Sequence, residues 1–272
     1  MKRVFNSRTY ETVRDVLTSD TTMTLERAKA ELQRRGINMS TSTIWRIATK
    51  KLRLSHKKIT TKLAVVFDDH ITNQRQNYAQ RVNPLHDQEL WFLDESGFDL
   101  HIAPLRNWSP KGRPTVQAVP TNRGVNVSLL MCIAPDGNVY YEIKNGPFKA
   151  ADFVGYLQAL ADHCPAIRDG EVCLVMDNAR IHHARAAQDF LRDNNINHIF
   201  LPPYSPELNP IELVFGVLKR RYRSRGVVHS QGQMKRRIKS IIDEMNRDLD
   251  VQTFYDHVRG FVQKAMARQP FN

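Results

Sequence analysis

Residues 171–221 read EVCLVMDNARIHHARAAQDFLRDNNINHIFLPPYSPELNPIELVFGVLKRR, and this stretch decides the fold. Its apolar run, Val172 to Met176, ends in Asp177 and Asn178. A short run rich in valine and leucine that is closed by polar residues predicts a buried strand. Open α/β sheets place ligands and chemistry at the carboxyl ends of such strands. We therefore expect Asp177 to lie at a functional site.

The pattern beyond this strand predicts a helix, a strand and a second helix. An amphipathic helix is expected from about residue 183 to 192, and a short strand at 198–201. Prolines exclude a helix from the turn at 202–210, because each removes a backbone donor. The next helix then begins with Asn209 as its N-cap and Pro210 at its first position. Glu212 follows at the position where a glutamate can also complete a capping box.

The composition is that of a basic globular protein. The 272 residues are 41% hydrophobic, which is enough for one large or two smaller domains. The net charge of +12 predicts a polyanionic partner, either nucleic acid or an anionic membrane. The longest apolar run, residues 127–134, is too short to cross a bilayer, and no amino-terminal segment resembles a signal peptide. We therefore expect nucleic acid as the partner, no membrane and no secretion. The three cysteines, Cys132, Cys164 and Cys173, are expected to be reduced.

Residues 1–55 are predicted to form a helix-turn-helix domain. Helices are expected at about 8–17, 24–35 and 43–51, with Gly36 ending the second of them. In a helix-turn-helix, the amino-terminal residues of the second helix reach base edges in the major groove. Here those residues are Ser42, Thr43 and Arg46, while Lys50, Lys51 and Arg53 would bind phosphates. A small helical bundle with a solvated basic face remains the alternative.

Residues 56–84 are predicted to be a basic linker followed by a helix at about 63–80. Lys57 and Lys58 lie in this linker, where they would follow a phosphate backbone. The Asn83-Pro84 pair marks the expected boundary of the next domain.

Residues 85–225 are predicted to form an α/β domain with the element order of a ribonuclease H-like fold. An apolar run at 89–93 leads into Asp94, which suggests that a strand ends there. Strands are expected at 125–133 and 139–143, joined by a hairpin turn, and a helix at 150–163. Residues 226–272 are expected to be a carboxyl-terminal helical extension.

Three carboxylates stand out at the expected element ends, namely Asp94, Asp177 and Glu212. A set of carboxylates without thiols suits a hard cation such as Mg²⁺ or Mn²⁺. Phosphodiester cleavage often uses two such ions, one at the attacking oxygen and one at the leaving oxygen. The sequence therefore predicts a two-metal site for DNA chemistry.

The chain resembles the mariner-like superfamily of DDE transposases, which includes bacterial insertion-sequence enzymes. Four motifs carry the resemblance: FLDESGF at 92–98, NWSPKG at 107–112, VMDNA at 175–179 and LPPYSPELNPIE at 201–212. The spacing of Asp177 and Glu212 is also usual for that family.

The resemblance implies that Asp94, Asp177 and Glu212 are the catalytic, metal-binding residues. It further implies that the segment with Trp108 and Lys111 contacts the partner subunit or the transposon end. Members hydrolyse DNA strands at terminal inverted repeats, and the freed 3′-hydroxyl attacks target DNA, usually at TA, within a protein dimer. Full-length relatives commonly carry two helix-turn-helix units, whereas one is evident here.

Other residues allow two interpretations each. Asn178 either supports the site by hydrogen bonding or forms a turn. His182 or His183 either contacts a scissile phosphate or a metal-bound water, or lies at the surface where the helix begins. Glu95 is expected to point away from the metals of Asp94, because successive strand residues face opposite sides. The basic residues Lys219, Arg220 and Arg221 either bind phosphates or form a solvated face.

An active transposase is the first hypothesis. A catalytically inactive DNA-binding protein descended from a transposase is the second, and the three intact carboxylates favour the first. A general ribonuclease H-like nuclease is disfavoured by the separate helix-turn-helix. The expected location is the nucleus in a eukaryote, or the cytoplasm and nucleoid in a bacterium.

Overall fold

The computed structural model describes residues 5–57 and 63–271, which form two compact units. The first unit covers Met1–Leu63 and the second Ala64–Asn272. Among the described residues, no helix is both long and apolar enough to cross a membrane.

The first unit is built from three helices around a small core. These are α1 (Ser7–Thr18), α2 (Leu25–Arg34) and α3 (Thr41–Arg46), and α3 continues into a π-helical turn, Ile47–Lys51. Each α-helix is capped by a polar side chain that accepts from a backbone N–H, as expected for Asn, Thr and Ser at this position. The core consists of Val13, Val16, Ala28, Leu32, Met39, Ile44 and Ile47.

The connection between α2 and α3 spans residues 35–40. Gly36 adopts a φ of 76°, a conformation that glycine enters without steric cost, and its N–H bonds to the Gln33 carbonyl. Ser40 then caps α3. The helix-turn-helix order of the elements is thus present.

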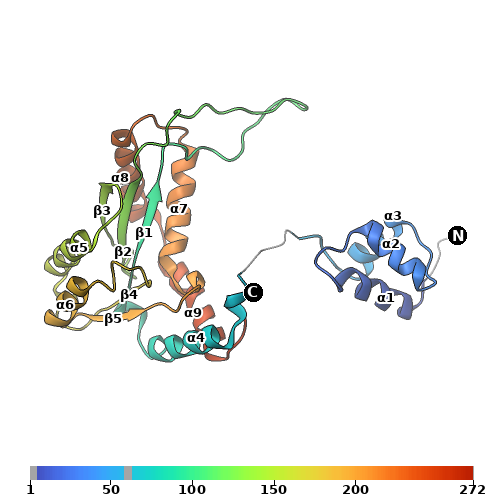
Figure 1. The fold of residues 1–272 in the computed structure, drawn as a ribbon, viewed down its shortest axis with the longest axis horizontal. Helices are drawn as coiled ribbons and strands as arrows, with labels where there is room; N and C mark the ends of the chain where they lie inside the picture. Colours follow the sequence, from blue (N-terminus) through green and yellow to red (C-terminus); the bar gives the residue numbers. More distant parts are fainter. Residues whose placement is uncertain (1–4, 58–62, 272) are drawn as a thin grey trace. The chain divides into compact units, whose positions relative to one another are not determined.

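The second unit contains a five-stranded mixed sheet (Figure 1). Its strands are β1 (Leu90–Phe98), β2 (Val127–Ile133), β3 (Val139–Asn145), β4 (Cys173–Met176) and β5 (Asn197–Phe200). The order is β3-β2-β1-β4-β5; β1, β2 and β3 pair antiparallel, whereas β1, β4 and β5 pair parallel. The predicted ribonuclease H-like fold, an antiparallel meander followed by parallel strands, is confirmed.

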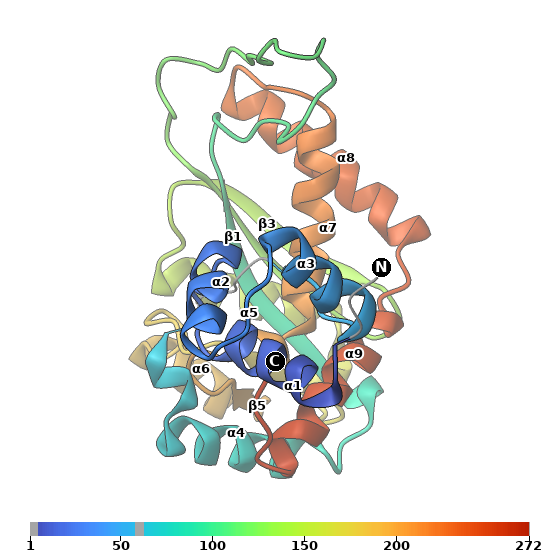
Figure 2. The same ribbon diagram turned by 90° about the vertical axis from the view of Figure 1, so that its right-hand side faces the viewer.

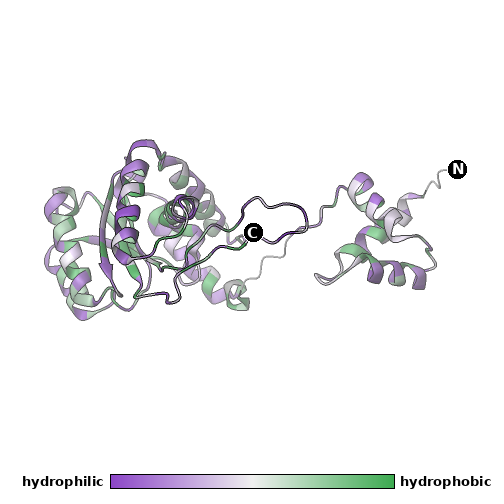
Figure 3. Ribbon diagram, turned by 90° about the horizontal axis from the view of Figure 1, so that it is seen from above, coloured by the Kyte–Doolittle hydropathy of each residue, from purple (hydrophilic) through white to green (hydrophobic). Residues whose placement is uncertain are grey.

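Helices cover both faces of this sheet. Helices α5 (Ala150–His163) and α6 (Arg185–Asp193) pack on one face, and α7 (Pro210–Ser224) packs on the other (Figure 1). The face with α7 is also covered by α4 (Asp69–Val82), α8 (Gln231–Asp248) and α9 (Gln252–Met266). Figure 2 shows α7 and α8 crossing this face from another side. The helices carry hydrophobic and hydrophilic residues on different sides, visible in Figure 3 as green and purple.

The segments before residue 85 and after residue 225 share a core with the sheet. Tyr78 and Val82 of α4, Ile238 of α8 and Tyr255 of α9 are buried in the same cluster as Phe92 of β1. The expected boundaries at 84 and 225 therefore separate sequence motifs, but they do not separate independently packed domains. The helix expected at 63–80 also differs, because a 3-10 turn, Ala64–Phe67, precedes α4.

The strand that carries Asp94 does not end there, as the sequence had suggested. β1 continues to Phe98, because its pairing with β2 extends over Phe92–Phe98 and because Phe98 is buried in the core. Pairing of β1 with β4 does stop just before Asp94. The polar residue thus marks the end of the parallel ladder only.

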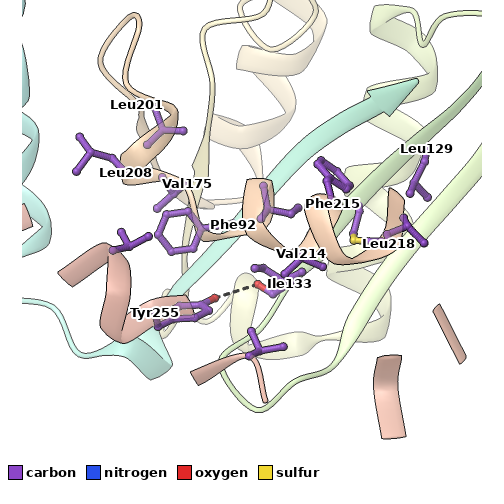
Figure 4. Close-up of a cluster of buried hydrophobic side chains, with 14 of the residues drawn as sticks. Phe92, Leu129, Ile133, Val175, Leu201, Leu208, Val214, Phe215, Leu218 and Tyr255 are labelled. Atoms are coloured by element: carbon purple, nitrogen blue, oxygen red, sulfur yellow. Dashed lines mark hydrogen bonds between the residues drawn. The ribbon is translucent and has the colours of Figure 1, made fainter. Parts of the chain in front are cut away.

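The hydroxyl of Tyr255 ties α9 to the sheet. It lies within hydrogen-bonding distance of the Leu90 carbonyl at 2.9 Å and the Ile133 carbonyl at 3.3 Å. Figure 4 marks the contact with Ile133. Tyr255 is only 2% exposed, so removing the hydroxyl leaves a buried carbonyl with one donor fewer.

We predict that Tyr255→Phe lowers the free energy of unfolding by about 1–2 kcal/mol, the usual effect of losing a buried hydrogen bond. Urea denaturation of the full chain measures this. Tyr204→Phe is the matched control, because Tyr204 is half-exposed and its hydroxyl bonds to no described residue; its effect should stay within about 0.5 kcal/mol. Equal effects of the two changes would contradict the proposed tie.

Candidate active site

Asp94, Asp177 and Glu212 line one cavity of about 310 Å³ in the second unit. The residues come from three elements: β1, the end of β4 and the first turn of α7. The rest of the lining is supplied by the end of β4 and by the proline-rich turn, namely Asn178, Ala179, Leu201, Pro202, Pro203, Tyr204, Ser205, Pro206 and Asn209. The three predicted carboxylates are therefore brought together.

Asp94 and Asp177 are neighbours because of strand register. Leu93 of β1 lies opposite Met176 of β4 in the last parallel pair, so the next residue on each strand is an aspartate. Asp94 is 9% exposed, and Asp177 keeps 45% of its side chain exposed. The end of the parallel pairing between β1 and β4 thus places two carboxylates side by side.

Asn209 connects Asp94 to the helix that carries Glu212. Its amide nitrogen donates to Asp94 Oδ2 at 2.9 Å, and its Oδ1 accepts from the Ile211 N–H at 3.4 Å. Asn209 is 3% exposed. The sequence predicted Asn209 only as an N-cap. Its second contact, with a strand 115 positions earlier in the chain, carried no local signal.

Glu212 does not complete a capping box. The Asn209 N–H donates to the Pro206 carbonyl, and the Glu212 side chain bonds to no other described residue. Its carboxylate is exposed at the cavity. The interpretation of Glu212 as a capping-box residue is therefore wrong, and its carboxylate oxygens are available to a ligand.

Burial and negative neighbours raise the pKa of Asp94 to about 7. Burial is the larger cause, followed by the charge of Asp177, with smaller effects from Glu212 and Glu95. The Glu95 N–H donates to Asp94 Oδ1 at 2.7 Å and opposes this shift. The carboxylates therefore repel one another until a cation or a proton joins them.

His182 is fully buried beside Asp177 and is not a surface residue. Its Nδ1 lies 2.9 Å from Asp177 Oδ1 and 3.1 Å from the Asp177 carbonyl, and its Nε2 lies 3.3 Å from Glu95 Oε1. Burial alone would lower the pKa of His182, but the hydrogen bonds to Asp177 and Glu95 raise it to about 10. Burial alone would raise the pKa of Asp177, yet the bonds from His182 and the Ala179 N–H lower it.

Glu95 points to the other face of β1 from Asp94, as predicted from strand alternation. There its oxygen reaches His182 beside α5, whereas Asp94 faces Asn209. The role of Glu95 near the site was not foreseen, because contact through His182 depends on a residue far along the chain.

Asn178 links the carboxyl ends of β4 and β5 by a hydrogen bond. Its amide nitrogen donates to the Leu201 carbonyl, just after β5, and its oxygen lies 3.2 Å from His183 Nε2. His183 in turn stacks on Phe200 at 4.2 Å. His183 thus supports Asn178, while His182, of the two histidines, is the one that contacts a carboxylate of the cavity.

Arg75 of α4 is buried and donates hydrogen bonds to the proline-rich turn. Its Nε donates to Ser205 Oγ at 2.8 Å, and its Nη2 donates to the Tyr204 carbonyl at 2.8 Å. Tyr204 has a φ of 52°, which is strained for a side chain of this size. Arg75 thus stabilises the turn that leads to Asn209 and Glu212.

In the first unit, Ser42, Arg46, Lys50, Lys51, Arg53 and Lys57 are exposed, as DNA contacts must be. Thr43 is partly buried, and its hydroxyl bonds to Ser40 Oγ at 2.9 Å, which commits it to the helix cap. Trp45 was not predicted, yet it is 54% exposed on the same face as Ser42 and Arg46. Lys58 lies outside the described residues.

The loop between β1 and β2 runs out beyond the sheet (Figures 1 and 2). Trp108 is 99% exposed there, and Lys111 is exposed too, so neither lines the carboxylate cavity. Of the basic residues on α7, Arg221 pairs with Asp248 at 3.0 Å, whereas Lys219 packs over Phe98 and Arg220 is exposed.

The carboxylate cavity fits a hard divalent cation. Asp177 Oδ2 and both oxygens of Glu212 accept from no described donor, so three carboxylate oxygens at the cavity are available to a cation. Glu95, Asp177 and His182 form a second group whose ligand atoms lie within 4.8 Å of one another. A cation in that second group would have to displace a hydrogen bond of His182.

Comparisons with known proteins agree with this geometry. The family described as DDE superfamily endonuclease matches residues 89–235, more than half of the chain. Among curated proteins, no sequence matches significantly.

Solved structures give the same fold. A Mos1 strand transfer complex matches with a TM-score of 0.74 and 17% identity, covering 100% of this chain and 81% of that chain. A Mos1 mariner paired-end complex with Mn matches with a TM-score of 0.72 and 18% identity, covering 98% of this chain and 80% of that chain. The Mos1 catalytic domain matches with a TM-score of 0.56 and 18% identity, covering 79% of this chain and 100% of that chain.

We predict that the stability of metal-free protein depends on pH through Asp94. Its folded pKa of about 7 lies above the ordinary value of 3.8, so the folded state holds this proton more tightly. The resulting stabilisation is present at pH 4 and is lost as the pH rises to 7. Asp94→Asn carries no such proton. In EDTA, the Tm of the variant relative to wild type should therefore rise between about pH 4 and 7 and stay level above pH 7. A difference in Tm that is independent of pH would contradict this.

Proposed function

The chain belongs to the DDE superfamily of endonucleases, and on this premise we propose that it is a mariner-like DNA transposase. It binds the ends of its element, cleaves DNA strands there and joins the freed 3′-hydroxyl to target DNA. The observation that carries the proposal is the meeting of Asp94, Asp177 and Glu212 at one cavity from three separate elements. The names of the matched complexes, a strand transfer complex among them, support it.

Asp94, Asp177 and Glu212 would hold Mg²⁺ or Mn²⁺, and we propose two ions. When bound, such ions lower the pKa of the attacking hydroxyl and stabilise charge on the leaving oxygen. Asn209 keeps Asp94 oriented, and the strand pairing fixes Asp94 next to Asp177. Glu212 and Tyr204 line the cavity and are exposed, so the cavity is open to solvent on their side.

The first unit recognises the ends of the element. Ser42 and Arg46 share the exposed face of α3 with Trp45, and this face enters the major groove. Lys50, Lys51, Arg53 and Lys57 bind phosphates nearby. The side chain of Trp45 offers apolar contact to a thymine methyl group.

A second set of basic residues lies on the catalytic unit. Arg106 of the long loop and Arg220 and Arg223 of α7 line one hollow of about 250 Å³. No carboxylate of a described residue pairs with any of the three, whereas Arg221 and Arg225 both have acidic partners. Three guanidinium groups around one hollow favour an anion, and we propose a DNA phosphate there.

The transposase acts as a homodimer on double-stranded DNA, with TA as its target. The Trp108 loop, with its exposed Trp108 and Lys111, is the proposed contact with the partner subunit or the transposon end. This activity places the protein where chromosomal DNA is, in the nucleus of a eukaryote or the cytoplasm of a bacterium.

The direct test is cleavage of a labelled duplex carrying the terminal repeats of the element. We predict nicking at the repeat end with Mg²⁺ or Mn²⁺ and none with EDTA. Asp177→Ala should lower the rate of cleavage by more than about 10- to 100-fold, which is the usual loss of activity when a residue that only supports a metal ligand is removed. Asp189→Ala is the matched control, because Asp189 lies on α6, does not line the cavity and, among the described residues, forms ion pairs with Arg185 and Arg192 only. Specific binding without cleavage under either metal would favour the inactive DNA-binding protein instead.

Salt dependence tests the arginine hollow without knowledge of the repeat sequence. We predict that Arg220→Ala with Arg223→Ala reduces the slope of log Kd against log salt by about 0.9 for a generic 30-base-pair duplex, the value for one phosphate contact. Arg221→Ala should leave the slope unchanged, because Arg221 is engaged with Asp248. Fluorescence anisotropy between 50 and 200 mM salt measures both. Equal slopes in wild type and double variant would contradict a phosphate at this hollow.

A further inference from the structure

His182 is fully buried beside the three carboxylates that line the cavity. Its side chain is 0% exposed, and its ring packs against Phe153 with centroids 4.5 Å apart. Its backbone is fixed as well, because its N–H donates to the Ala179 carbonyl at 3.0 Å and its carbonyl accepts from Gln188 Nε2 at 2.7 Å. The ring is therefore held in one position.

This fixed ring determines how Asp177 presents its two oxygens. Oδ1 of Asp177 accepts from the Ala179 N–H at 2.9 Å and faces His182 Nδ1 at 2.9 Å. No described residue donates to Oδ2. One oxygen is thus occupied on the protein side, and the other is left for a ligand in the cavity that Asp177 lines.

Glu95 fixes the other side of the ring. Its Oε1 lies 3.3 Å from His182 Nε2, so each ring nitrogen faces a different carboxylate. Glu95 follows Asp94 directly on β1 and points to the opposite face of the strand. One strand therefore supplies both a carboxylate of the cavity and, through His182, the anchor of the second carboxylate.

We propose that His182 and Glu95 are positioning residues that hold Asp177 so that only Oδ2 binds the cation. This inference rests on the proposed metal-dependent function. The opposing arrangement, in which Glu95, Asp177 and His182 themselves bind a cation, requires His182 to give up a hydrogen bond to one carboxylate. Outer-shell partners of this kind commonly change metal affinity by about 10- to 100-fold.

The test is Mn²⁺ binding to the full chain without DNA, followed by the electron paramagnetic resonance signal of free Mn²⁺. His182→Leu fills the buried volume but donates no hydrogen bond. We expect it to bind Mn²⁺ about 10- to 100-fold more weakly than wild type. His182→Asn places an amide nitrogen where Nδ1 was, so it keeps the bond to Asp177. We expect its affinity to recover to within about threefold of wild type.

A second pair of variants keeps the test decisive if His182→Leu does not fold. Glu95→Gln retains an acceptor for His182, whereas Glu95→Ala removes it. We expect Glu95→Ala to bind Mn²⁺ more weakly than Glu95→Gln at equal Tm in EDTA. Equal affinities of this pair would overturn the role of Glu95.

The remaining outcomes separate the inference from the proposed function. Unchanged affinity in folded His182→Leu would overturn the inference alone. Equal loss in His182→Leu and His182→Asn would overturn it too, because the imidazole would then be a metal ligand. Absence of saturable Mn²⁺ binding to wild type, or full binding to Asp177→Asn, would overturn the proposed function and the inference with it.

Discussion

The parallel pairing of β1 with β4 is the constraint on which the candidate site depends. Leu93 opposite Met176 is the last pair of that ladder, and it sets Asp94 beside Asp177. This placement is electrostatically unfavourable, since burial and the neighbouring charge raise the pKa of Asp94 to about 7. The surrounding fold offsets that repulsion with hydrogen bonds from Asn209 to Asp94 and from His182 to Asp177. Asp94 is thus held by a residue far along the chain, and Asp177 by a histidine in the turn that follows its own strand.

Much of the fold was predictable because the signals were local. Apolar runs closed by polar residues predicted β4 and the β2–β3 hairpin, and Asn209 with Pro210 predicted the start of α7. The three carboxylates followed from the same signals. The extension of β1 past Asp94 was missed, because pairing with β2 and burial of Phe98 override the polar residues within that strand.

The supporting residues could not be predicted, because their roles depend on long-range contacts. Asn209 reaches Asp94, Arg75 reaches Ser205, and Glu95 reaches His182, each across a large separation in sequence. The packing of α4, α8 and α9 in one core with the sheet also depends on long-range contacts. A catalytic unit that includes these helices has a rigid frame for the proline-rich turn. That rigidity matters, because a carboxylate must be placed accurately to bind a metal.

The proposed cation binds among Asp94, Asp177 and Glu212. The most direct measurement is anomalous X-ray scattering from crystals of the full chain soaked in Mn²⁺. We expect anomalous density within bonding distance of oxygens from all three carboxylates, with His182 still bonded to Asp177 Oδ1. Density bonded instead to His182 and Glu95, with Glu212 unoccupied, would contradict it.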